Sequence, residues 1–189
     1  MRKKSHISLA RHLVSGISEQ DLHKHRKAFY LGNILPDCKP SFITTKHEIE
    51  GTFGQLADRI KRLIEGADYS NLRVFYRDFG QVVHYIADYF TFPHNEHYEG
   101  SLKDHCMYEK HLKKSIKQYC GSSVPVMTGE GVDALATAEA ICAFIREAHS
   151  LYLRVKTNVE ADVRWIVTLC QKVVEAIIAA TRNYRQSFA

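Results

Sequence analysis

The sequence lacks closely spaced cysteines. It has five, an odd number with no Cys-x-x-Cys pair, and they lie far apart: Cys38, Cys106, Cys120, Cys142 and Cys170. This spacing argues against a disulfide framework and against a zinc site built from thiolates. Cysteines used in this way are typical of a reducing compartment.

Long apolar runs are missing as well. Charge interrupts every run well short of the ~20 residues that a membrane-spanning helix needs, and the longest stretches are 81–86 and 176–181. The basic start over residues 1–4 resembles the beginning of a secretory signal, but Arg11 and His12 interrupt the apolar stretch that should follow. We therefore expect no transmembrane segment and a cytoplasmic protein.

The signals of β-structure are also absent, because no β-branched run is bounded by an Asn-Gly or Asp-Gly turn. Apolar residues recur instead at three- and four-residue intervals, which predicts an all-α fold. With 45% hydrophobic residues in 189, the chain can bury a core as a single domain over residues 1–189. The predicted helices are 6–16, 19–32, 47–65, 71–91, 101–119, 131–156 and 159–187.

The net charge of +5 comes partly from clusters of basic residues at 2–4, 23–27 and 110–117. A solvated helix face is the plainer explanation of such clusters, and attraction of an anionic substrate or surface is the alternative. The charge alone does not decide between them.

Some of the eleven histidines stand at informative positions. His84 and Asp88 are four residues apart and share one helix face, and Pro93 ends that helix just before His94. The rest of the helix is apolar on most sides, so it is expected to be buried. A buried carboxylate costs several kcal/mol unless it is paired or binds a metal, and a metal ion would supply the partner.

A second pair, His105 and Glu109, follows at the same spacing. One such pair alone is more often a surface hydrogen bond than a metal site. Two helices that each offer an imidazole and a carboxylate can enclose metal ions between them, which predicts a metal cluster inside a multi-helix domain. Nitrogen and oxygen ligands without thiolate favour Zn²⁺, with Mn²⁺ and Fe as alternatives.

The segment His84-Tyr-Ile-Ala-Asp88-Tyr-Phe-Thr-Phe-Pro93-His94 resembles the signature of the zinc-dependent phospholipase C and single-strand nuclease superfamily. His105-x-x-x-Glu109 stands where the next ligand pair of that family is expected. Upstream, residues 32–37 are similar to its Gly-x-x-x-Pro-Asp segment. The potential ligands occur in the family's order: His6, Asp37, His47, His84, Asp88, His94, His105 and Glu109.

The resemblance implies two or three zinc ions. The first would be bound by Asp37, His47, His84 and Asp88. The second would be bound by His94, His105, Glu109 and water. Asp88 would bridge to a third ion that His6 helps to hold, and His12 is an alternative to His6. The remaining histidines are expected to take no part in catalysis: His23, His25, His97, His111 and His149.

The sequence departs from the family at residue 1, where it has Met and secreted members have an N-terminal Trp that completes the third site. Glu109 closes the second pair, as in the phospholipase branch, whereas the nuclease branch uses Asp. Cys38 follows Asp37, and the positions that read a choline headgroup are not matched.

The resemblance thus implies a metal-dependent phosphodiester hydrolase that resembles phospholipase C, with Asp37 as the general base. Its partner would be a phosphodiester substrate, such as a phospholipid headgroup at a membrane surface. The sequence alone leaves two alternatives open. One is a single-strand nuclease of the same superfamily, and the other is a non-catalytic helical protein that binds zinc.

Overall fold

The computed structural model describes residues 1–38, 48–66, 70–96, 98–122, 133–155 and 158–187. These residues form α-helices and short 3₁₀ turns and no strand, so the predicted all-α fold is confirmed. No helix in this part of the chain is both long and apolar enough to cross a membrane. The helices are α1 (Lys3–Gly16), α2 (Gln20–Lys24), α3 (Arg26–Gly32), α4 (Ile49–Glu65), α5 (Leu72–Tyr89), α6 (Leu102–Gly121), α7 (Ala138–Arg154) and α8 (Val159–Gln186).

Five of the seven predicted helices match observed ones to within three residues at each end, and two do not. The predicted helix 19–32 is divided into α2 and α3 at His25, whose backbone (φ −101°, ψ 17°) leaves the helical region. The predicted helix 131–156 begins only at Ala138, because the Thr137 hydroxyl caps it by accepting a hydrogen bond from the Ala140 N–H. Residues 133–135 ahead of that cap form a 3₁₀ turn.

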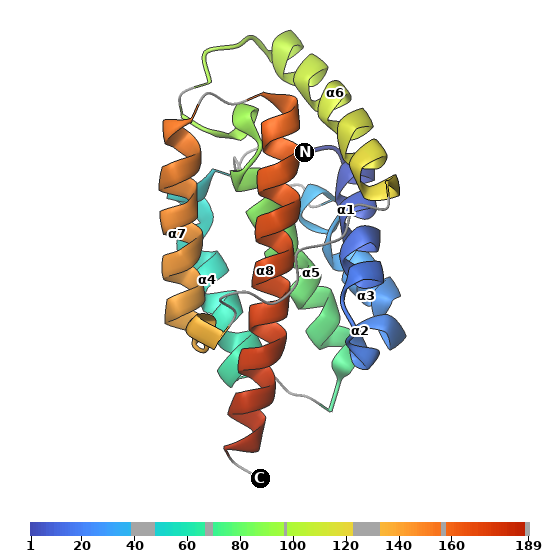
Figure 1. Ribbon diagram of the computed structural model, residues 1–189, viewed down its shortest axis with the longest axis vertical. Helices are drawn as coiled ribbons and strands as arrows, with labels where there is room; N and C mark the ends of the chain where they lie inside the picture. Colours follow the sequence, from blue (N-terminus) through green and yellow to red (C-terminus); the bar gives the residue numbers. More distant parts are fainter. Residues whose placement is uncertain (39–47, 67–69, 97, 123–132, 156–157, 188–189) are drawn as a thin grey trace.

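The long helix α8 runs through the middle of the bundle (Figure 1) and packs against α4, α5, α6 and α7. Its start is fixed by Asn158, whose side chain accepts a hydrogen bond from the Ala161 N–H. Its apolar stripe is buried in the core, as the sequence predicts. This helix therefore contacts helices from both the first and the second half of the sequence.

Helix α5 lies against α3 along a contact between two glycines. A Cβ atom added to Gly32 would collide with the Arg77 carbonyl, and one added to Gly80 would collide with the Phe29 carbonyl. Glycine at both positions lets the two backbones touch. The close approach places Asn33 and the 3₁₀ turn η1 (Pro36–Cys38) beside the middle of α5.

Replacing Gly80 by Ala should separate these two helices. Overpacking of this kind costs ~1–3 kcal/mol, so we expect the Gly80→Ala variant to lose about that much free energy of unfolding in a urea titration. Gly51 is the matched control, since it lies in α4 with open space around its Cβ position. The Gly51→Ala variant should instead gain up to ~1 kcal/mol. Equal stability of the two variants would contradict the proposed close contact.

Candidate metal centre

Helix α5 supplies two of the predicted ligands, His84 and Asp88, one turn apart. Both are fully buried. Asn71 caps the helix by accepting a hydrogen bond from the Val74 N–H, and twelve of its residues are buried. The carboxylate of Asp88 is thus held away from solvent, as the sequence predicts.

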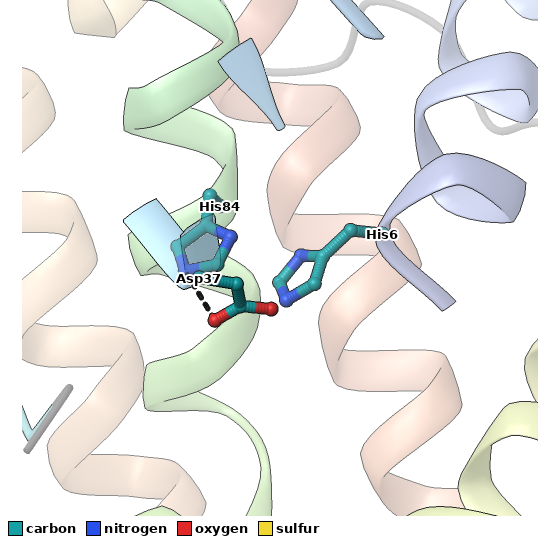
Figure 2. A group of neighbouring side chains, drawn as sticks. All are labelled: His6, Asp37 and His84. Carbon is teal, nitrogen blue, oxygen red and sulfur yellow. Dashed lines mark ion pairs between the residues drawn. The ribbon is translucent and has the colours of Figure 1, made fainter. Parts of the chain in front are cut away.

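His84 meets two residues from distant parts of the chain, His6 of α1 and Asp37 of η1 (Figure 2). One nitrogen or oxygen atom of each of the three lies within 4.8 Å of the corresponding atoms of the others. His84 Nε2 is 3.7 Å from Asp37 Oδ1. The rings of His6 and His84 stack with their centroids 4.1 Å apart. These three residues form what we call the inner cluster.

A backbone carbonyl fixes the orientation of His84. Nδ1 of His84 lies 2.9 Å from the carbonyl oxygen of Asn33. Because a carbonyl can only accept, Nδ1 donates, and Nε2 is turned toward Asp88 Oδ2 at 3.2 Å. In the neutral ring Nε2 is itself an acceptor, so it faces the carboxylate favourably only with a cation or a proton between them. Metal-binding histidines are commonly held by such an outer hydrogen bond.

His6 is the clearest sign that the inner cluster suits a metal. Both of its ring nitrogens are buried without a hydrogen-bond partner among the described residues. Burial, followed by the charge of His84, lowers the pKa of His6 to about 3. The ring is therefore neutral at physiological pH, which is the form that binds metals. Its Nε2 lies 3.4 Å from Asp88 Oδ1.

A second group, which we call the outer cluster, consists of His94, His105 and Glu109, all partly buried. Oε1 of Glu109 lies 3.4 Å from His94 Nε2 and 3.5 Å from His105 Nε2. Although burial raises the pKa of Glu109, hydrogen bonds from the two histidines and the charge of the Met1 ammonium bring it well below its ordinary value. Glu109 is therefore a carboxylate, and burial keeps the pKa of His94 low.

Local sequence explains how the outer cluster forms. Ser101 and Asp104 form a capping box, in which each side chain accepts a hydrogen bond from the backbone N–H of the other. This starts α6 at Leu102 and puts His105 and Glu109 on one face. The 3₁₀ turn η3 (Phe92–His94), with Pro93 near its start, delivers His94 to the same place.

Asp88 joins the two clusters, and the α-amino group of Met1 sits between them. That nitrogen lies 2.5 Å from Asp88 Oδ1, 3.3 Å from Glu109 Oε1 and 3.1 Å from His94 Nε2. Burial lowers the pKa of this amine, but the two carboxylates outweigh burial and raise it. Burial also raises the pKa of Asp88, and the same ammonium and the nearby histidines bring it well below its ordinary value. A positive charge therefore stands where the donor atoms converge.

The structure brings together seven of the eight predicted ligands and places the histidine alternatives elsewhere. His47 lies outside the described residues. His12 is part of neither cluster and lies edge-on to Tyr119, so the geometry favours His6 over His12. His149 belongs to neither cluster, and its Nε2 lies 2.8 Å from Asn95 Oδ1 in the core.

A cleft of about 1160 Å³ opens onto the outer cluster. It is lined by Asp37, His94, His105 and Glu109, while His6, His84 and Asp88 lie behind it. A substrate in the cleft would meet the outer cluster and Asp37 first.

Sequence reasoning missed a supporting residue, Asp162 of α8. This buried carboxylate accepts hydrogen bonds from the Phe92 N–H at 2.9 Å and from the hydroxyls of Tyr108 and Tyr152, each at 2.8 Å. Phe92 starts the turn that carries His94, and Tyr108 precedes Glu109. Asp162 therefore connects α8 to both arms of the outer cluster. An acidic residue in the first turn of a helix is common, so nothing in the sequence marks Asp162 for this role.

A family model described as zinc dependent phospholipase C matches residues 5–159, which include all eight predicted ligands. No curated protein and no solved structure matches the chain.

The contacts of Asp162 predict a pH-dependent contribution to stability. Burial raises its pKa to about 6, against the lowering effect of its three hydrogen-bond donors. Its pKa is thus higher in the folded than in the unfolded protein, so ionisation between about pH 4 and pH 6 favours unfolding. Relative to Asp162→Asn, the wild-type free energy of unfolding should fall by ~1–3 kcal/mol over this range and then level off.

The measurement is urea unfolding at several pH values with the same zinc load. Glu160→Gln, in the same turn of α8 but exposed, is the control and should follow the wild type at every pH. A constant difference between wild type and Asp162→Asn would show that burial does not raise the pKa of Asp162.

Proposed function

The chain belongs to the zinc-dependent phospholipase C family, and we propose that it hydrolyses the phosphodiester of a phospholipid or a related ester at the metal centre described above. The family resemblance predicted from the sequence is confirmed. The observation that carries the proposal is the pair of adjacent clusters joined by the buried carboxylate of Asp88. A single structural ion would not need donor atoms in two groups, one of them open to a cleft.

The residues fit two or three zinc ions. Asp37, His84 and Asp88, with His47, would hold the first ion, and the outer cluster would hold the second. His6 and Asp88 would contribute to a third. The supporting observations are the unpartnered nitrogens of His6, the neutral state of that ring and the ammonium of Met1, which occupies the position that a cation would favour.

The charge of such a centre suits an anionic substrate. The three carboxylates of Asp37, Asp88 and Glu109 carry −3, against +4 for two divalent ions and +6 for three. The centre would therefore keep a net charge of +1 or +3 and attract a phosphodiester into the cleft. Bound zinc ions supply Lewis-acid stabilisation of phosphoryl oxygens and lower the pKa of water from ~16 toward ~7.

We assign Asp37 the role of general base. Its side chain is only 6% exposed, yet it lines the cleft, so it can reach a water molecule beside the substrate. A carboxylate there accepts the proton as that water attacks phosphorus. Asn33 and Asp162 are positioning residues, because they hold His84 and the two arms of the outer cluster without reaching the cleft.

Zinc content and turnover test the proposal together. Purified protein should contain two or three zinc ions per chain and hydrolyse bis(p-nitrophenyl) phosphate and phospholipid, and it should lose turnover with a chelator. The His105→Ala variant should lose about one zinc, whereas His111→Ala, on the exposed side of the same helix, should keep the full amount. Zinc-loaded protein without turnover on any diester would favour the structural alternative, and preference for single-stranded DNA would favour the nuclease.

The Asp37→Asn variant tests the assigned base. The amide keeps the shape of the side chain but cannot accept the proton, so turnover should fall ~10²–10⁴-fold at the pH optimum. Zinc per chain is measured in parallel to separate loss of the base from loss of an ion. Asp78→Asn, on α5 but outside the centre and the cleft, serves as control. Full metal content together with full turnover in Asp37→Asn would exclude the role.

A further inference from the structure

A second hollow adjoins the metal cleft and is strongly basic. It is a groove of about 530 Å³ between α1 and α6, with Ile7 and Ile34 among its lining residues. The described residues that line it include no carboxylate. They include six cations: Lys3, Lys4, Arg11, Lys113, Lys114 and Lys117. We call this feature the basic groove.

Helical spacing produces the basic groove. Lys4 and Arg11 stand seven residues apart on α1, and Lys113 and Lys117 stand four apart on α6, so each helix lines one wall with cations. The two helices pack against one another. Two of the basic clusters seen in the sequence thus meet in the folded protein.

These cations differ from Arg77 and Arg182 in their surroundings. Arg77 and Arg182 form ion pairs with Asp78 and Glu19. Within the described ranges, no carboxylate lies at ion-pair distance from any of the six cations of the basic groove. Like charges gathered without acidic partners repel one another, and an external anion would relieve that repulsion.

The basic groove is continuous with the metal cleft. Lys3, Lys4 and Lys113 line both hollows. An apolar residue also lines the cleft, namely Leu102 at the start of α6, which is 80% exposed. One face of the protein therefore presents a row of cations, an exposed leucine and the opening to the candidate metal centre.

We propose that this face docks onto an anionic phospholipid membrane, with lipid headgroups in the basic groove and the metal cleft open to the lipid surface. The inference rests on the proposed function and adds where the substrate is presented. Clustered Lys and Arg beside an exposed apolar side chain favour peripheral binding to an anionic membrane. Single-stranded nucleic acid is a poorer match, because the described lining of the groove offers no aromatic side chain on which a base could stack.

The test uses co-sedimentation with vesicles, which requires no hydrolysis. Zinc-loaded protein should bind vesicles of phosphatidylcholine mixed with phosphatidylglycerol, should bind pure phosphatidylcholine weakly, and should dissociate at high salt. The double variant Arg11→Glu/Lys117→Glu changes two groove residues that do not line the cleft. Its vesicle partitioning should fall by at least about tenfold.

The matched control is Lys24→Glu/Arg73→Glu, which changes the net charge equally at exposed positions outside both hollows. It should bind vesicles as the wild type does. Circular dichroism verifies folding, and Arg11→Gln/Lys117→Gln should lie between wild type and the charge reversal. Equal binding by the charge-reversal and control variants would overturn the proposal, as would binding to a single-stranded oligonucleotide but not to anionic vesicles.

Turnover of the soluble diester by the same preparations keeps the two proposals separate. Vesicle binding without any turnover would leave the docking face standing and remove the proposed hydrolase activity. Turnover of the soluble diester without preference for anionic vesicles would support the hydrolase activity and remove the proposed docking face.

Discussion

The architecture depends on the need to neutralise one buried carboxylate. Asp88 lies in the middle of the bundle with no solvent to stabilise its charge, and a lone ion there would cost several kcal/mol. His84 from its own helix, His6 from α1 and the ammonium of Met1 all converge on it. The Met1 ammonium, which lies just before α1, therefore supplies the compensating positive charge, and the apolar face of α1 packs into the core.

Sequence reasoning predicted those parts of the fold that local periodicity determines. The four-residue spacing of His84 and Asp88, and of His105 and Glu109, predicts that each pair shares one helix face, and both pairs do so in the folded protein. The break at His25 and the late start of α7 at Ala138 were missed, because caps and backbone angles at helix ends depend on a few local contacts that apolar spacing does not reveal.

In the candidate site, too, the sequence predicted what depends on local spacing and missed what depends on tertiary contacts. Helical spacing identified His84, Asp88, His105 and Glu109, because imidazoles and carboxylates four residues apart share a helix face. His6, Asp37 and His47 were implied only by the family resemblance. The contacts that support these ligands leave no recognisable pattern in the sequence. The Asn33 carbonyl that orients His84 is a backbone atom and is the same for any residue. The hydrogen bonds from Phe92 and Tyr108 to Asp162 join positions more than fifty residues apart. They exist only once η3 and α6 have packed against α8.

Asp162 lies outside the segment that the family model matches. The matched segment ends at residue 159, so it contains every ligand candidate but not the carboxylate that anchors the turn of His94 and the helix of Glu109. The residues that identify the family and the carboxylate that supports the outer cluster thus lie in different segments of the chain. A relative that kept all the ligands but replaced α8 would need another buried acceptor to maintain the spacing of its metal ligands.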